Sequence, residues 1–159
     1  MSIHTPHLSK NISEQPFRIV IVASRYNADF VDSLVEEAQK EILNLAPKAT
    51  VEIVRVPGSF EIPLTVKLVA ERQEPDAILA LGVIIRGETA HADLIADAIT
   101  QHLLDISLHY SVPVIHEVLL LNNETQATAR CLGEGFNRGA EAARTALEMI
   151  HIAEAIQPL

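Results

Sequence analysis

Four short runs of apolar and β-branched residues, separated by helical patterns, constrain the fold of this chain more than any other feature of its sequence. They are RIVIVA at 18–23, TVEIVRV at 50–56, AILALGVII at 77–85 and VPVIHEVL at 112–119. Runs of this length and composition are typical of strands buried on both faces of a sheet. The sequence therefore predicts four strands that other elements cover from both sides.

Between these runs, apolar residues return at spacings of three and four, as on the buried face of an α-helix. We predict helices at 31–45, 62–71 and 90–108 and a last helical stretch around 143–150, with Asn27 or Asp29 available to cap the first. Strands that alternate with helices are joined by right-handed crossovers and form a parallel sheet. The predicted fold class is α/β, a three-layer α/β/α sandwich.

The length of 159 residues is that of one domain. The polar opening, MSIHTPHLSKNISEQP, predicts a flexible arm over 1–16, followed by a single domain over 17–159. Twelve Lys and Arg residues against twenty-one Asp and Glu residues give a net charge of -9. This charge disfavours nucleic acid and anionic membranes as partners.

The single cysteine, Cys131, cannot form a disulfide within the chain, which fits a reducing compartment. No stretch approaches the roughly 20 apolar residues of a membrane helix, and the polar opening lacks the apolar run of a signal peptide. We expect a cytoplasmic protein without a membrane partner.

In parallel α/β sheets, ligands bind beyond the carboxyl ends of the strands. The segments that directly follow the predicted strands are SRYNAD, VPGSFE, IRGETAH and LLNNET. These four segments are therefore the candidates for a site.

The segment IRGETAH leaves a strand through Gly87 and enters a helix whose first N–H groups and dipole favour an anion such as phosphate. Thr89 is a further donor, and His91 lies in the first helical turn, where the dipole favours a neutral imidazole that accepts a proton. The alternative is an Arg-Gly turn with a capping Thr89 and a solvated His91.

In VPGSFEIP, Pro-Gly follows a strand and Ser59 precedes a helix, so the peptide groups of Ser59 and Phe60 point at whatever fills the cleft. Glu61 is a candidate hydrogen-bond acceptor for a ring N–H. The alternative is an ordinary turn in which Ser59 caps the helix and Glu61 complements its dipole.

In RCLGEGFNRG, Arg130 precedes a glycine-rich approach to a helix, which suits a phosphate, and Arg138 is a second cation nearby. The alternative is an exposed arginine and a glycine at a helix end. Arg130 is placed to lower the pKa of the Cys131 thiol, but no His or acidic partner is fixed beside that thiol in the sequence. We expect a bystander thiol.

His102, Asp105 and His109 share one face of the long predicted helix. The rise of the helix separates the two histidines by roughly 10 Å, so no single ion takes both. We expect no metal site.

Taken together, SRYNADF, VPGSFEIP, ALGVIIRGETAH, PVIHEVL, ARCLGEGFNRGAEAA and ALEMI resemble the lumazine synthase family of riboflavin biosynthesis, from about Phe17 to Ile150. The resemblance implies a flavodoxin-like sandwich with a four-stranded parallel sheet. It implies the condensation of 5-amino-6-(D-ribitylamino)uracil with 3,4-dihydroxy-2-butanone 4-phosphate to 6,7-dimethyl-8-ribityllumazine, phosphate and water, without a cofactor. It also implies a homo-oligomer, a pentamer or a multiple of pentamers, with each site shared between subunits.

The resemblance implies that Tyr26 stacks on the pyrimidine ring, His91 shuttles protons and Arg130 grips phosphate from the neighbouring subunit. The ring and ribityl chain would be lined by Asn27, Ser59, Phe60, Glu61, Val83, Ile84 and Ile85, and phosphate would be held by Gly87, Glu88 and Thr89. We expect the Glu88 backbone to bind while its side chain turns away.

The sequence departs from the family at two places: His116 stands where many relatives carry an aromatic residue against the pyrimidine, and LLNNET replaces a Thr-Thr-Asp type segment. A non-catalytic flavin or lumazine carrier, or a shell-forming relative, is the alternative function. The presence of His91 and Arg130 favours the enzyme.

Overall fold

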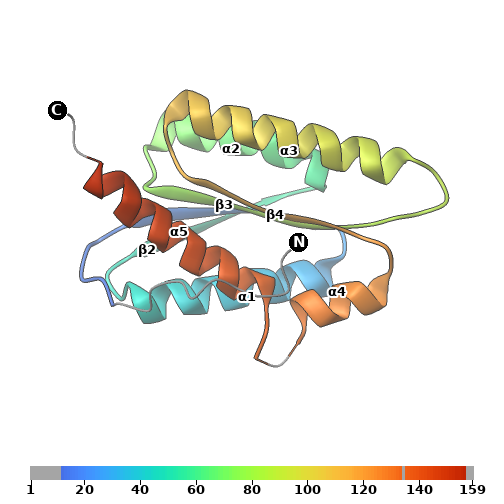
Figure 1. Ribbon diagram of the computed structural model, residues 1–159, viewed down its shortest axis with the longest axis horizontal. Coiled ribbons are helices and arrows are strands. Elements are labelled where there is room, and N and C mark those ends of the chain that lie inside the picture. Colours follow the sequence, from blue (N-terminus) through green and yellow to red (C-terminus); the bar gives the residue numbers. More distant parts are fainter. Residues whose placement is uncertain (1–11, 134, 157–159) are drawn as a thin grey trace.

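The computed structural model describes residues 12–133 and 135–156, which form a four-stranded parallel sheet with helices on both faces (Figure 1). The strands lie in the order β2-β1-β3-β4, the order of a flavodoxin-like sheet. Their bounds are β1 Arg18–Ser24, β2 Thr50–Val56, β3 Ala77–Ile85 and β4 Val114–Leu121. The four predicted strands are confirmed, but β2, at the edge of the sheet, is largely exposed and not covered from both sides.

Two helices cover one face of the sheet and three cover the other (Figure 1). On the first face lie α2 (Ile62–Gln73) and α3 (His91–Tyr110), and a short 3-10 turn, η1 (Ser59–Glu61), leads into α2. On the second face lie α1 (Ala28–Leu45), α4 (Glu124–Cys131) and α5 (Arg138–Ala155). The predicted three-layer α/β/α sandwich is confirmed.

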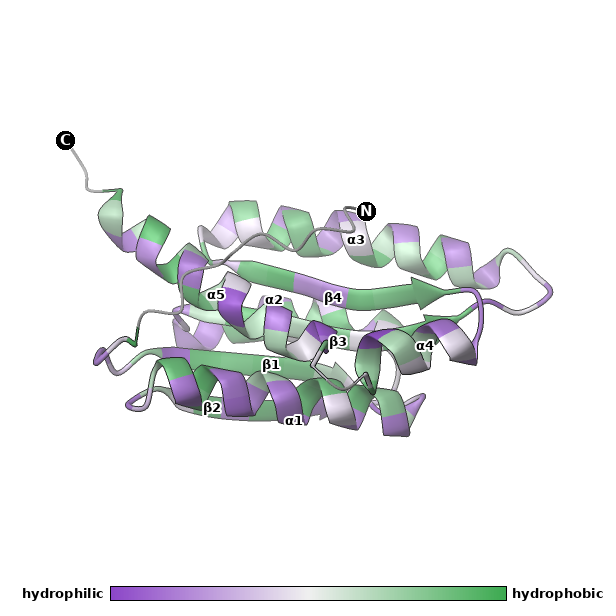
Figure 2. Cartoon of the chain, turned by 60° about the horizontal axis from the view of Figure 1, so that its bottom comes forward, coloured by the Kyte–Doolittle hydropathy of each residue, from purple (hydrophilic) through white to green (hydrophobic). Residues whose placement is uncertain are grey.

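The central strand β1 shows why consecutive residues in the strand sequences are apolar. Ile19 and Ile21 enter the core under α1 and α5, whereas Val20 and Val22 enter the core under α2. All four side chains are fully buried. Figure 2 shows the same pattern, with the strands coloured as hydrophobic and the helices alternating between polar and apolar residues. Both faces of a covered parallel sheet must be apolar, which removes the usual alternation.

The fourth strand and the helix after it differ from the prediction. The strand begins at Val114, after Pro113, and extends to Leu121 rather than Leu119. A short helix, α4, then begins at Glu124 within the segment expected to be a loop, with the Asn123 side chain accepting from the Gln126 N–H at 2.9 Å. This helix has only two buried side chains, so its sequence carries almost no apolar periodicity.

The predicted arm over 1–16 lies mostly outside the described residues, because the structure describes none of residues 1–11. Of the part that is described, the Ser13 N–H donates to the Leu45 carbonyl at 2.7 Å, and Glu14 pairs with Lys48 at 2.9 Å. In the described ranges, no helix has the length and apolar character needed to cross a membrane.

Helices α1 and α5 approach so closely that only glycine fits at position 139. A Cβ built on Gly139 would lie 2.0 Å from the Leu34 carbonyl oxygen. That oxygen belongs to the backbone of a buried helix, so neither side can move without shifting a whole element.

We predict that Gly139→Ala lowers the free energy of unfolding by about 3 kcal/mol or more, as overpacking of a rigid contact does. Gly87→Ala is the matched control, because a Cβ at Gly87 meets nothing within 4 Å. Urea unfolding measures both variants. Equal stabilities of the two variants would contradict the close approach.

Candidate functional site

The strand order places the carboxyl ends of β2, β1 and β3 side by side, so the segments after them converge. The Ser59 hydroxyl in η1 donates to the Ser24 hydroxyl at the end of β1 at 3.5 Å, and both residues are buried. A Cβ at Gly82 in β3 would lie 2.8 Å from the Ser59 Oγ, so this glycine lets the hydroxyl lie against the strand. Ser59 thus binds the turn to the sheet, and its side chain makes no cap bond to α2.

An exposed aromatic ring lies over the turn after β2. The Gly58 N–H donates to Glu61 Oε2 at 2.8 Å, and a Cβ at Gly58 would lie 3.3 Å from Cδ2 of Tyr26. Tyr26 and Phe60 leave 73% and 63% of their surface exposed. One oxygen of the Glu61 carboxylate is therefore used within the turn, beside a ring that is open for stacking.

Asn27 links this turn region to β3. It adopts a left-handed conformation (φ 56°, ψ 47°), which Asn tolerates better than most residues. Its Nδ2 donates to the Val83 carbonyl at 2.7 Å, and its side chain makes no cap bond to α1. Asn27 thus occupies the N-cap position of α1, as predicted, but caps the helix with its backbone carbonyl, which accepts from the Val31 N–H at 3.1 Å, and not with its side chain. The amide instead holds the loop that carries Tyr26 against the end of β3, where Val83, Ile84 and Ile85 lie.

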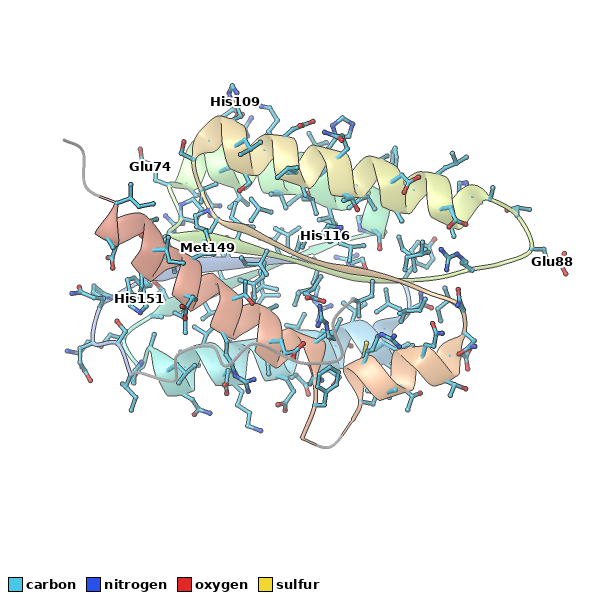
Figure 3. All side chains as sticks on the ribbon, viewed as in Figure 1. Glu74, Glu88, His109, His116, Met149 and His151 are labelled. Atoms are coloured by element: carbon cyan, nitrogen blue, oxygen red, sulfur yellow. The ribbon has the colours of Figure 1, made fainter. Side chains whose placement is uncertain are left out.

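The β3–α3 loop carries the predicted phosphate-binding residues at its tip. Gly87, Glu88 and Thr89 are exposed, and His91 is the first residue of α3. The His91 N–H lies 3.4 Å from Thr89 Oγ1. Figure 3 shows Glu88 at the outer end of the loop, with its side chain pointing away from the body of the molecule. The first N–H groups of a helix have no partner within that helix, so this end of α3 favours an anion.

The two predicted cations lie in the helical layer on the other face of the sheet. Arg130 is in the last turn of α4, and its Nη1 donates to the Gln126 carbonyl at 3.3 Å. Arg138, the first residue of α5, forms ion pairs of 2.6 Å with both Glu117 and Glu141. Burial raises the pKa of Glu117, and the Arg138 charge opposes that rise. Arg138 is thus held in an ion-pair cluster against β4.

His116 lies in the middle of β4, opposite Ala80, and between the sheet and α3 (Figure 3). Its Nδ1 accepts from the Val118 N–H at 3.1 Å, and its Nε2 lies 2.8 Å from the Thr100 hydroxyl. Because Nδ1 accepts a hydrogen bond, the neutral ring carries its proton on Nε2. Burial lowers the pKa of this ring. Within one chain, the structure does not bring His116 to the strand ends near Tyr26.

The thiol of Cys131 has a raised pKa, not a lowered one. Burial is the main cause and raises the pKa of Cys131 to about 11. The negative charge of Glu117 raises this pKa further, and the positive charge of Arg130 lowers it by less than the other two effects raise it. Arg130 therefore does not lower the pKa of this thiol below its ordinary value, and the thiol is buried, as expected of a bystander. Among the described residues, no three His, Cys, Asp or Glu side chains are grouped to hold a metal ion.

Sequence reasoning missed two polar contacts close to the predicted site residues. Ser24 stands at the end of an apolar run and gave no signal beyond its place after a strand. Glu117, next to His116 in an otherwise apolar strand, did carry a signal, because a carboxylate is almost never fully buried without a partner. Its partner, Arg138, is 21 positions away in the sequence.

We predict that the free energy of unfolding falls as the pH drops below about 6.5, in part because of His116. The unfolded ring takes up a proton at a higher pH than the folded ring, so acid favours the unfolded chain. His116→Asn retains an acceptor for the Val118 N–H and should flatten this dependence, whereas His109→Asn, at an exposed site, should not. Urea unfolding at about pH 5 and about pH 7 measures the slopes. A wild-type slope in His116→Asn would contradict the assignment.

The sequence was compared with known protein families and with curated proteins. Residues 16–154 match the family described as 6,7-dimethyl-8-ribityllumazine synthase. A protein of that name from Stenotrophomonas maltophilia (strain R551-3) is 39% identical over 138 residues, which are 86% of this chain and 89% of the relative. Another from Xanthomonas campestris pv. campestris (strain B100) is 37% identical over 149 residues, which are 93% of this chain and 97% of the relative.

These matches cover nearly the whole chain, including every segment that contributes a predicted site residue. They confirm the family that the sequence motifs resemble. The chain therefore belongs to the 6,7-dimethyl-8-ribityllumazine synthase family.

Proposed function

We propose that this chain condenses 5-amino-6-(D-ribitylamino)uracil with 3,4-dihydroxy-2-butanone 4-phosphate to give 6,7-dimethyl-8-ribityllumazine, phosphate and water, without a cofactor. Family membership supports this reaction. The observation that carries it in the structure is the convergence of three strand ends, which places the open ring of Tyr26 beside the Glu61 turn and the end of β3.

The chemistry of the reaction matches the proposed roles. The condensation forms an imine, expels phosphate and closes a ring, so it requires proton transfers and groups that stabilise the departing anion. His91, the first residue of α3 and exposed beside the proposed phosphate-binding loop, is the proposed proton carrier. The backbone of Gly87, Glu88 and Thr89 is the proposed phosphate cradle, and the outward direction of the Glu88 carboxylate supports it.

The proposed site needs a second copy of the chain. His91 begins α3 on one face of the sheet, whereas Arg130 ends α4 on the other face (Figure 1). This separation supports a site in which neighbouring subunits supply the two residues. A ring of such head-to-tail contacts is heterologous, so each subunit gives half of two sites. We propose a homo-oligomer, a pentamer or a multiple of pentamers, with sites at its subunit interfaces.

Exposed apolar side chains support this assembly. Along α3, Leu94, Leu104 and Leu108 leave 67%, 56% and 71% of their surface exposed. Large apolar side chains gathered on one helix indicate a surface that another chain covers. We also propose a cytoplasmic location, which the buried, unpaired thiol of Cys131 supports.

The direct test supplies both substrates to the purified protein and follows lumazine fluorescence together with phosphate release. Equal amounts of both products are expected. Binding of a lumazine or flavin without turnover would instead support the non-catalytic carrier.

We predict that His91→Ala lowers kcat by about 10- to 10³-fold, the range of typical acid–base contributions, while the KM for the pyrimidine stays near that of the wild type. His109→Ala, an exposed histidine at the other end of α3, is the matched control. Steady-state kinetics with each substrate measures both variants. An unchanged kcat in His91→Ala would remove this residue from the mechanism.

We predict that coexpression of the His91→Ala and Arg130→Ala chains restores activity that neither variant has alone. An Arg130→Ala subunit still offers His91 to a neighbour that still offers Arg130. With random mixing, about one site in four keeps both residues, so turnover should approach roughly a quarter of the wild-type value. An activity that merely averages the two variants would show that the site lies within one chain.

A further inference from the structure

Arg86 joins three elements at the carboxyl end of the sheet. It directly follows β3, and its Nε and Nη2 donate to Asp93 Oδ1 in the first turn of α3 at 3.0 and 2.7 Å. Its Nη1 donates to Asn122 Oδ1 just after β4. Its backbone N–H donates to the Leu121 carbonyl at 2.8 Å, which continues the pairing of β3 with β4.

These contacts bracket the loop that carries the proposed phosphate cradle. Arg86 stands at the entry of the loop, and Asp93 stands two residues after His91. All residues from Gly87 to His91 are exposed. In the described part of the chain, the only side-chain hydrogen bond within this stretch is the 3.4 Å contact of Thr89 with the His91 N–H. The Arg86–Asp93 ion pair thus joins the entry of the loop to the first turn of the helix that follows it.

The positive charge of Arg86 is paired with the negative charge of Asp93. The hydrogen bond from Arg86 is the main cause that lowers the pKa of Asp93, and the same bond raises the pKa of Arg86. Asp93 also lies in the first turn of α3, where the helix dipole favours a carboxylate. Arg86 is thus committed to Asp93 and Asn122 through a planar fork, which fixes a direction as well as a distance.

We propose that the Arg86–Asp93 pair positions the β3–α3 loop, and with it His91, for the condensation. This inference rests on the proposed function. Arg86 acts through the loop and does not bind the substrate phosphate itself. Effective catalysis depends on the placement of the reacting groups to within about 1 Å, so a loosened loop should slow turnover without weakening pyrimidine binding.

The first test compares single and double variants. Arg86→Gln and Asp93→Asn should each lower kcat by about 10- to 100-fold, with the KM for the pyrimidine unchanged. The double variant should be no slower than either single variant, because both remove the same interaction. Wild-type kcat in Asp93→Asn would overturn the proposal.

Arg18→Gln is the matched control. Arg18 also ties several elements together, at the opposite end of the sheet, by donating to the Gln73 carbonyl at 2.8 Å and pairing with Glu52 at 3.5 Å. Its side chain is 45% exposed, compared with 39% for Arg86. Arg18→Gln should therefore retain kcat. If Arg18→Gln slows turnover as much as Arg86→Gln does, the loss reflects general stability and the proposal fails.

A charge reversal separates positioning from direct phosphate binding. Arg86→Asp combined with Asp93→Arg exchanges the two charged side chains, so an ion pair can form again between positions 86 and 93. This double variant should recover part of the activity that Arg86→Asp alone loses. A phosphate ligand at position 86 would not be recovered in this way, so a double variant as inactive as Arg86→Asp would overturn the proposal.

Amide hydrogen exchange at Leu94, whose N–H donates to the Ala90 carbonyl at 3.1 Å where the loop enters α3, gives a readout without substrate that does not depend on activity. Exchange should be faster in Arg86→Gln and Asp93→Asn than in the wild type and in Arg18→Gln. Unchanged exchange would show that another interaction holds the loop and would overturn the proposal. If the wild type makes no lumazine, the proposed reaction fails, and the exchange data still decide whether the ion pair holds the loop.

Discussion

Burial of the parallel sheet on both faces determines where chemistry is possible in this chain. Adjacent residues of β1 enter opposite cores, so neither face of the sheet has room for a solvated ligand at this central strand, whereas the edge strand β2 is largely exposed. The buried polar side chains follow the same constraint: Ser24 bonds to Ser59, and Glu117 pairs with Arg138. The strand order gathers the carboxyl ends of three strands at one edge of the sheet, outside the buried cores.

The two helical layers then separate the functional groups. The layer of α2 and α3 carries His91 and the anion-binding end of a helix, whereas the layer of α1, α4 and α5 carries Arg130 and Arg138. In one chain, His91 and the two arginines therefore lie in different helical layers, and this separation is the basis of the proposed sharing of each site between neighbouring chains. In the proposed ring, the exposed leucines of α3 would lie against another chain.

The strands and the layered fold could be predicted from the sequence because their signals are local and periodic. The position of the candidate segments at the strand ends was also predictable, since these segments follow strands of a parallel sheet; their roles in a site stay a prediction. Contacts between distant side chains were not. Asn27 reads as a helix cap, yet its amide reaches Val83, 56 positions away. The helix α4 was missed because its two buried residues are too few to give the sequence a helical periodicity of apolar residues. The tie of His116 to Thr100 depends on the packing of α3 over β4, which no local pattern specifies.

We propose that a complete site exists only between two copies of the chain. This is tested by the specific rate of lumazine formation across a dilution series, with the assembled fraction determined by sedimentation velocity at each concentration. We expect the rate per chain to fall in proportion to the assembled fraction and to vanish for isolated chains. Isolated chains that retain the full rate would contradict a site shared between subunits.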